Sequence, residues 1–373
     1  MKFLSMQLSV FLILINLVMT GCSSNDYRLF TAGYTRDPGE AGFNMYDFNP
    51  ASGELTKISG HDAGPNPSYF CYLPEKKMFY VANEVREFKG EPGGGLTTLR
   101  YDEKNGQIVK MHEMAVPNGG PCYISLSADK GFVFMANYSR GSVAVIKLDA
   151  EGIPESVADT LFYIKNPPDR SHAHMILSDP AGKKVYVTDL ALDKVLVYDF
   201  DKTSGRLTPS ANPYVQLPEG EGPRHFVFKP DGSKLYVINE LGSTVMVFNV
   251  DDSNGLQLLQ TLPTTSKDFS GKNYCADIHI GKDGKDLYGS NRGENTIVTF
   301  AIGADGLLSL AGHTSCGGDW PRNFTIDPSG KFILVGNQRS DNIAVFRINA
   351  KTGLPEEPVK EYPSTSPACL KFY

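Results

Sequence analysis

Six side chains able to bind anions or exchange protons occupy two sets of equivalent positions in a repeated segment of the chain. They are three arginines, two glutamates and one histidine: Arg224, Arg292, Arg322, Glu84, Glu240 and His174. A planar arginine binds carboxylate or phosphate through two parallel hydrogen bonds, whereas lysine, absent from these positions, is a point charge. The set predicts an anionic small-molecule substrate and acid/base chemistry. Alternatively, the same charges join neighbouring repeats through buried hydrogen bonds.

The repeat that places these residues is about fifty residues long. Its most regular part is a run such as FYVANE, VYVTDL or LYVINE, which ends in small or polar residues. The aligned residues of the seven copies are Gly33, Asn83, Asn137, Asp189, Asn239, Asn291 and Asn337, at intervals of 50, 54, 52, 50, 52 and 46. Valine, isoleucine, tyrosine and phenylalanine are frequent in these short runs, which favours strands over helices.

Two further predicted strands, one before and one after each run, recur at equivalent positions in the copies. The following strand ends at Asn49, Asp102, Asp149, Asp201, Asp251, Gly303 and Asn349. The preceding strand opens 16 residues before the aligned residue, at Pro67, Pro121, Ala173, Pro223, Cys275 and Pro321. The copy missing at the N-terminus is found at the other end of the chain, from Pro367 to Tyr373. The pattern predicts an all-β fold: a seven-bladed β-propeller of four-stranded blades, closed by the C-terminal strand joining the N-terminal blade.

This strand order also predicts where the six side chains lie. The first two strands of a blade are joined by a tight turn, as at Pro230–Ser233, so the start of the first lies beside the end of the second. The six residues directly follow these two points in their repeats. We therefore expect them on one face of the disc, near its axis.

The first residues of the chain are predicted to direct export. One positive charge, Lys2, precedes an apolar run, and Thr20 and Gly21 before Cys22 resemble a bacterial lipoprotein processing site. We expect a signal peptide over residues 1–21, a tether over 22–28 that begins at lipidated Cys22, and a single propeller domain over 29–373. The protein would be exported and lipid-anchored at the bacterial membrane, in the periplasm or at the cell surface. An uncleaved N-terminal anchor is the alternative.

Composition and spacing limit the partners. With 36 basic and 42 acidic residues and a net charge of −6, the chain does not fit a nucleic-acid binder. His172 and His174 would share a face of a strand and could chelate a metal, but no third ligand is evident. The Gly93–Gly95 run lacks the lysine and Ser/Thr of a phosphate-cradling loop. We expect no cofactor, no metal, no nucleic acid, and a monomer or weak oligomer.

Several segments resemble one known family. The chain is similar to the seven-bladed β-propeller lactonases in HAHMILSDPAGK, GPRHFVFKPDGSKLYVINEL, SNRGENTIVTF and PRNFTIDPSGKFILVGNQRSDNIAVFRIN. The named activity of this family is 6-phosphogluconolactonase, and muconate cycloisomerases are distant relatives. The site of the cycloisomerase branch, carried over by motif, implies His174 with His172 beside it, Arg224, Glu240 and Arg292. The chain departs from the family at Tyr123, where members often have histidine, and at Asp277, where they have glutamate.

The residues and the resemblance together predict a lactonase that hydrolyses a sugar lactone. Glu240 would be the general base on water and His174 the proton donor to the leaving ring oxygen. Arg292 and Arg224 would stabilise the oxyanion or bind a carboxylate or phosphate. Arg322 and Glu84 would complete the rim, with His172 also in contact with substrate. The alternatives are a non-catalytic propeller that binds an anionic ligand at the cell surface, and a cycloisomerase that forms a lactone.

Overall fold

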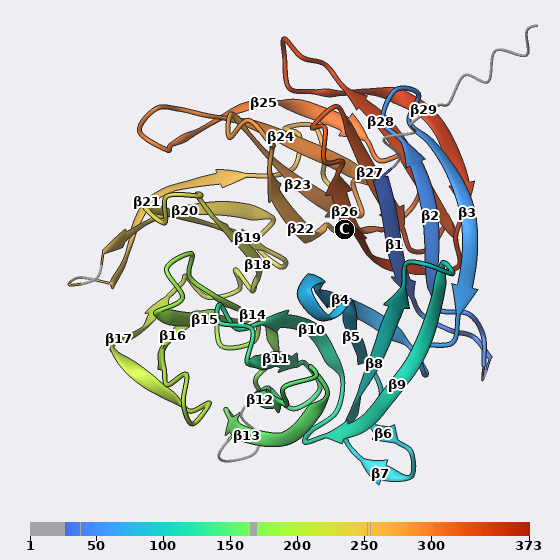
Figure 1. Ribbon diagram of the computed structural model, residues 1–373. Coiled ribbons are helices and arrows are strands. Elements are labelled where there is room, and N and C mark those ends of the chain that lie inside the picture. Colours follow the sequence, from blue (N-terminus) through green and yellow to red (C-terminus); the bar gives the residue numbers. More distant parts are fainter. Residues whose placement is uncertain (1–26, 38, 165–169, 252, 254) are drawn as a thin grey trace, which may run out of the picture.

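Each predicted repeat forms one four-stranded antiparallel sheet, and seven such sheets surround a central axis (Figure 1). The computed structural model describes residues 27–37, 39–164, 170–251, 253 and 255–373. The predicted all-β, seven-bladed architecture is confirmed. Blades are numbered 1 to 7 along the chain, and the strands of each are A to D from the axis outward.

Every blade follows the same order of strands from A to D. Blade 1 contains β30 (Pro367–Phe372), β1 (Tyr27–Gly33), β2 (Phe43–Asn49) and β3 (Glu54–His61); blade 2 contains β4 (Pro67–Leu73), β5 (Met78–Asn83), β8 (Gly94–Asp102) and β9 (Gln107–Val116). Blade 3 contains β10 (Pro121–Leu126), β11 (Phe132–Asn137), β12 (Ser142–Leu148) and β13 (Pro154–Phe162); blade 4 contains β14 (Ala173–Ser178), β15 (Lys184–Asp189), β16 (Lys194–Phe200) and β17 (Leu207–Gln216). Blade 5 contains β18 (Pro223–Phe228), β19 (Lys234–Asn239), β20 (Thr244–Asp251) and β21 (Gly255–Pro263). Blade 6 contains β22 (Tyr274–Ile280), β23 (Asp286–Arg292), β24 (Thr296–Ile302) and β25 (Leu308–Ser315). Blade 7 contains β26 (Pro321–Ile326), β27 (Phe332–Asn337), β28 (Asn342–Ile348) and β29 (Pro355–Pro363). Blade 2 also carries a 3₁₀ turn, η1 (Pro74–Lys76), and a small hairpin of β6 (Glu87–Phe88) and β7 (Glu91–Pro92).

The two ends of the chain close the ring, as predicted. β30 pairs with β1 from Leu29 opposite Phe372 to Gly33 opposite Pro367. β1 begins at Tyr27, two residues before the predicted domain boundary, because Tyr27 and Arg28 already pair with Phe48 and Asp47 on β2. The predicted signal peptide and the lipidation site at Cys22 lie outside the described residues.

A β-bulge at the start of strand A turns the site residues toward the axis. The predicted 16-residue spacing joins directly paired residues: Pro67 and Asn83, Pro121 and Asn137, Ala173 and Asp189, Pro223 and Asn239, Cys275 and Asn291, and Pro321 and Asn337. After each pair the register shifts because strand A contains an extra residue. The extra residues include His174, Arg224 and Arg322. A bulge breaks the alternation of side chains between the two faces of the sheet and redirects the side chain of the extra residue. This explains why three site residues share this position.

The recurring asparagine at the end of strand B has a structural role. Its amide donates to the loop that leads into strand A: Asn83 to the Ala63 carbonyl at 2.7 Å, and Asn337 to the Cys316 carbonyl at 2.9 Å. Asn291 makes the equivalent bond. These bonds tie the start of strand A to the end of strand B, and so fix the two backbone points that carry the site.

The core lies between neighbouring blades. Strands such as β5, β11 and β27 are buried along their whole length, whereas the outer strands β9 and β29 are largely solvent-facing. The five described cysteines are buried and unpaired, as small hydrophobic residues. Within the part of the chain that the structure describes, no helix has the length and apolar character needed to cross a membrane.

Candidate active site

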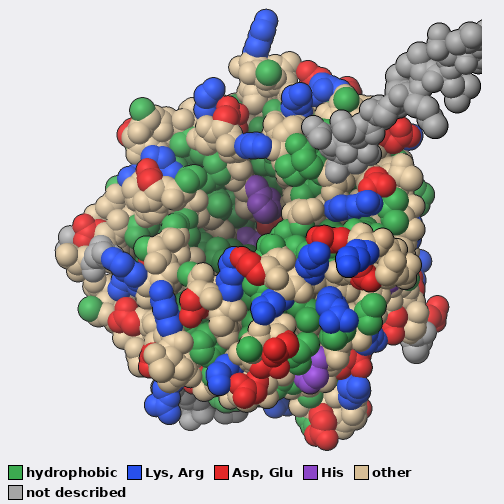
Figure 2. All heavy atoms as spheres, in the orientation of Figure 1, with side chains coloured by type: hydrophobic (Ala, Val, Ile, Leu, Met, Phe, Trp, Pro, Cys, Tyr) green, Lys and Arg blue, Asp and Glu red, His purple; other side chains and the backbone are tan. Residues whose placement is uncertain are grey.

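A cavity of about 140 Å³ lies where strands A begin and strands B end. Its lining comes from six different blades: Glu84, Cys122, Tyr138, His174, Glu240, Arg292 and Arg322. These residues lie at the start of strand A, or at or directly after the end of strand B, so the predicted face and axial position hold for the lining residues. The space-filling view shows that the face of the disc turned to the viewer is hollowed at its centre (Figure 2).

Glu240, which follows β19, is held between two arginines. Its Oε2 atom lies 2.7 Å from Nη2 of Arg292 and 3.0 Å from Nε of Arg224. Arg292 is fixed in turn by bonds of 3.0 Å to the carbonyls of Tyr274 and Cys275. Burial raises the pKa of Glu240, but the two arginine charges outweigh it and hold the pKa below its usual value. Glu240 is therefore an ionised carboxylate and a weak proton acceptor.

His174 is buried and neutral. Burial lowers its pKa well below the usual range, and the positive charge of Arg224 lowers it further. Its ring meets that of Tyr138 edge to face, with centroids 5.7 Å apart. Its Nδ1 atom is buried and finds no hydrogen-bond partner among the described residues. A neutral imidazole with an unsatisfied nitrogen can accept a proton or a hydrogen bond from a molecule in the cavity.

Arg322, Glu84 and Tyr34 form a second charged group at the cavity. The Tyr34 hydroxyl donates to Oε2 of Glu84 at 2.5 Å and accepts from Nη2 of Arg322 at 2.7 Å. Burial raises the pKa of Tyr34, so the phenol stays protonated. Burial alone would lower the pKa of Arg322, but Tyr34 and Glu84 raise it overall. Sequence reasoning did not select Tyr34, although it follows Gly33 at the position equivalent to Glu84 and Glu240.

A buried polar network continues from Arg224 along the inner strands. Nη1 of Arg224 lies 3.3 Å from Nε2 of His225, whose Nδ1 is 2.7 Å from Oδ1 of Asp277. His279 contacts the other oxygen of Asp277 at 2.9 Å, and Asn323 donates to that oxygen too. Burial raises the pKa of Asp277, but the two histidines outweigh it and hold the pKa well below normal. The network fixes His225 and, through it, the guanidinium behind Glu240.

This network makes the fold sensitive to acid. Burial and the charge of Arg224 lower the pKa of His225 from 6.5 to about 4, so the unfolded chain takes up this proton at a higher pH than the folded chain. We therefore expect the free energy of unfolding to fall as the pH drops from 6.5 to about 4, with about 3 kcal/mol of the loss due to His225.

Chemical denaturation of wild type and His225→Asn at a series of pH values measures this contribution. Asparagine retains a donor for Asp277 but does not titrate, so the variant should lose that part of the pH dependence. His313→Gln serves as control, because His313 lies on β25 and contacts the Thr264 carbonyl. An equal pH dependence in wild type and His225→Asn would contradict the assignment.

The structure brings five of the seven predicted substrate-site residues to the cavity: Glu84, His174, Glu240, Arg292 and Arg322. Arg224 is only 2% exposed and lies behind Glu240. Cys122 and Tyr138, which were not predicted as site residues, complete the lining. Burial raises the pKa of Cys122, so its thiol stays protonated.

His172 lies outside the cavity lining. The expected common strand face of His172 and His174 is wrong, because β14 begins only at Ala173 and His174 is the bulged residue. His172 instead stacks on Tyr138, with ring centroids 4.2 Å apart and planes 5° from parallel. Among the described residues, no group of three or more histidine, cysteine, aspartate or glutamate side chains is arranged to hold a metal ion.

Known proteins share this fold and sequence along nearly the whole described chain. A 6-phosphogluconolactonase from Formosa agariphila is 31% identical over 343 residues, which cover 88% of this chain and 96% of the relative. A 6-phosphogluconolactonase from an Enterobacter species is 32% identical over 327 residues, covering 87% and 93%. The solved structure of a periplasmic gluconolactonase from Pseudomonas aeruginosa has a TM-score of 0.86 and 33% identity, covering 93% of this chain and 99% of that chain. The family model described as lactonase, 7-bladed beta-propeller matches residues 28–372, and the chain belongs to that family.

Proposed function

We propose that the protein is a carboxylic ester hydrolase that opens the ring of a sugar lactone with water. The observation that carries this proposal is the cavity itself. A neutral histidine, whose Nδ1 has no hydrogen-bond partner among the described residues, and two arginines face the same space, beside a carboxylate held by ion pairs. The gluconolactonase and 6-phosphogluconolactonase names of the similar proteins support the same chemistry.

Ring opening needs a base, an oxyanion stabiliser and an acid. His174 takes a proton from water as the water oxygen bonds to the lactone carbonyl carbon. The negative charge that develops on the carbonyl oxygen is stabilised by the Arg292 guanidinium. The bond from carbon to the ring oxygen then breaks, and the imidazolium of His174 returns its proton to that oxygen. The product is the open-chain hydroxy acid.

This order exchanges two roles assigned from the sequence. From the sequence, Glu240 is expected to take the proton from water and His174 to donate a proton to the leaving ring oxygen. Oε2 of Glu240 is held by both Arg292 and Arg224, whereas Nδ1 of His174 has no hydrogen-bond partner among the described residues. Burial lowers the pKa of His174, so its ring has no proton to donate at neutral pH. We therefore give the first proton transfer to His174. Glu240 holds Arg292 and Arg224 through Oε2, and its Oε1 can accept from a substrate hydroxyl.

Hydrolysis of a panel of phosphorylated and unphosphorylated aldonolactones, followed by acid release above the spontaneous rate, tests the proposal. We expect Glu240→Gln to lower kcat/KM at least about tenfold, because the neutral amide no longer pairs with two buried guanidinium groups. Glu219→Gln is the matched control, since Glu219 is exposed in the loop before β18. A loss of less than about threefold in Glu240→Gln would contradict the assigned role.

The same panel separates the alternative functions. Absence of turnover on every lactone, with ligand binding that Arg224→Ala abolishes, would indicate a non-catalytic binding propeller. Formation of a lactone from an unsaturated acid would indicate a cycloisomerase. Turnover of any lactone by the wild type that depends on His174 supports the hydrolase.

We also propose that the protein is exported and anchored by lipid at Cys22. The apolar run and the residues before Cys22 support this, as does similarity to a protein described as a periplasmic gluconolactonase. Export would place the enzyme where lactones outside the cytoplasm are its substrates. The family name alone therefore does not select among the lactones.

A further inference from the structure

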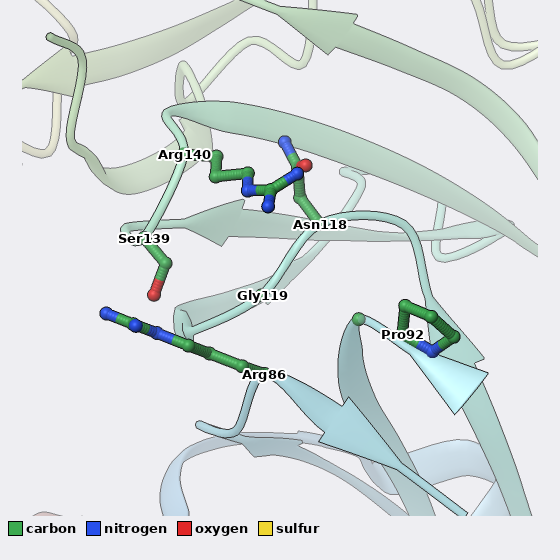
Figure 3. A pocket seen from close by; sticks show the side chains of 7 residues that line it. Arg86, Pro92, Asn118, Gly119, Ser139 and Arg140 are labelled. Carbon is green, nitrogen blue, oxygen red and sulfur yellow. The ribbon is translucent and has the colours of Figure 1, made fainter. Parts of the chain in front are cut away.

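A second pocket, of about 320 Å³, lies beside the catalytic cavity. It is lined by Arg86, Pro92, Gly93, Asn118, Gly119, Ser139 and Arg140 (Figure 3). We propose that it binds an oxyanion substituent of the substrate, a phosphate monoester or a carboxylate, while the lactone ring occupies the catalytic cavity. This inference rests on the proposed lactonase function and specifies its substrate as an anionic lactone.

The two pockets are built on the same loops. Glu84 and Tyr138 line the catalytic cavity, and Arg86 and Arg140 follow them by two residues each. The Tyr138 amide donates to the Gly120 carbonyl at 2.8 Å, and the Gly120 amide donates to the Val85 carbonyl at 2.7 Å. Two residues of extended chain span at most about 7 Å, so the linings of the two pockets start from neighbouring backbone positions. The proposal places one sugar-sized molecule across both pockets.

The positive charge of the second pocket has no partner among the described residues. Arg86 and Arg140 are exposed, and neither forms an ion pair or side-chain hydrogen bond with any described residue. Other exposed arginines, such as Arg36 with Asp341, do form ion pairs. Two unpaired guanidinium groups at one pocket attract an oxyanion and can bind it through paired hydrogen bonds.

The polar groups between the two arginines fit the same ligand. Nδ2 of Asn118 is buried and has no hydrogen-bond partner among the described residues. In Figure 3 the Asn118 and Arg140 side chains point toward one another, and the Ser139 hydroxyl is turned toward the end of Arg86. These are hydrogen-bond donors, and an amide N–H left unsatisfied is expensive unless a ligand acceptor meets it.

The backbone holds Arg86 at the edge of this pocket. The Gly93 amide donates to the Arg86 carbonyl at 3.0 Å. A Cβ atom at Gly119 would lie 3.1 Å from the Cα atom of Arg86, so a larger residue at this position would press against the Arg86 backbone. Gly93, the first residue of a glycine run that does not match a phosphate-cradling loop, thus forms part of the wall, and the arginines supply the charge.

Kinetics with a matched pair of substrates test the inference. The ratio of kcat/KM for 6-phosphogluconolactone to that for unphosphorylated gluconolactone is measured for wild type, Arg86→Ala and Arg140→Ala. Each variant should lower the ratio about tenfold, mainly through KM for the phosphorylated substrate. Arg100→Ala is the control, because Arg100 is exposed on β8 of the same blade and outside the pocket. A lactone bearing a carboxylate in place of the phosphate distinguishes the two oxyanions.

The outcomes separate this inference from the proposed function. Hydrolysis with an unchanged ratio in both arginine variants, for both oxyanions, overturns the anion pocket and leaves the lactonase standing. If neither lactone is hydrolysed, the lactonase fails, and calorimetry with 6-phosphogluconate and gluconate still tests the pocket. Preferential binding of 6-phosphogluconate that is lost in Arg86→Ala and Arg140→Ala supports the pocket, and equal binding by wild type and variants overturns it.

Discussion

Replacing His174 with glutamine should lower kcat/KM for lactone hydrolysis by about 10²–10⁴-fold, the usual contribution of a general acid/base. Glutamine fills a similar space and can hydrogen-bond, but it cannot take a proton from water. The measurement is the rate of acid release on the lactone that wild type turns over fastest. His61→Gln, on the outer strand β3 of blade 1, is the control and should retain the wild-type rate.

The pH profile identifies the direction in which His174 moves its proton. Its pKa lies well below 6.5 because of burial and Arg224. If the neutral ring is the base, kcat/KM is constant above that pKa and falls as the pH drops through it. If the protonated ring were the acid, kcat/KM would fall as the pH rises through the same pKa. A profile of the second kind would restore the order assigned from the sequence.

Replacing Arg292 with lysine should lower kcat by about 10²–10³-fold, although the positive charge is kept. Nε of Arg292 binds the Tyr274 carbonyl and Nη2 binds both the Cys275 carbonyl and Glu240. A lysine ammonium has no such fork and cannot make these contacts while facing the carbonyl oxygen of a substrate. The effect therefore measures the geometry of the guanidinium separately from its charge.

Single-turnover kinetics should show the Arg292→Lys loss in the chemical step, with substrate binding changed less. Arg339→Lys is the matched control, since Arg339 stacks at 3.3 Å on the Trp320 ring in blade 7 and does not line the cavity. A wild-type rate in Arg292→Lys would show that a positive charge alone suffices at this position. It would contradict the proposal that the geometry of the Arg292 guanidinium stabilises the oxyanion.

The architecture could be predicted because it depends on periodicity. The fixed spacing between residues such as Ala173 and Asp189 reflects direct pairing across one hairpin. The number of copies of this hairpin gives the number of blades. The copy of strand A that is missing at the N-terminus and present at the C-terminus predicts that the two ends of the chain close the ring. Both follow from local strand geometry that every repeat shares.

Depth within the site could not be predicted in this way. Arg224 and Arg322 occupy the same position in the repeat, yet Arg322 lines the cavity and Arg224 is buried behind Glu240. Their depth depends on the neighbouring side chains of adjacent blades, which the repeat does not encode. The β-bulge directs both side chains out of the sheet, and no particular residue type in the sequence marks its position.

The network around Asp277 was missed for a related reason. His225, Asp277 and Asn323 lie on β18, β22 and β26, three strands far apart in the sequence. Only the departure of Asp277 from the family's glutamate pointed to this position. The pKa shifts of Glu240 and His174 likewise arise from burial and from charges on other blades, so residue identity alone does not predict them.

The pairing of β30 with β1 has a consequence for how the molecule is made. Joining two strands separated by about 340 residues costs roughly 5 kcal/mol of chain entropy, which blade 1 offsets only when both strands are present. Because β30 follows every other strand of the disc in the chain, it is synthesised after all of them, and blade 1 is completed last. Until β30 is available, the inner edge of β1 has no partner strand, and the other six blades can form while the ring is still open.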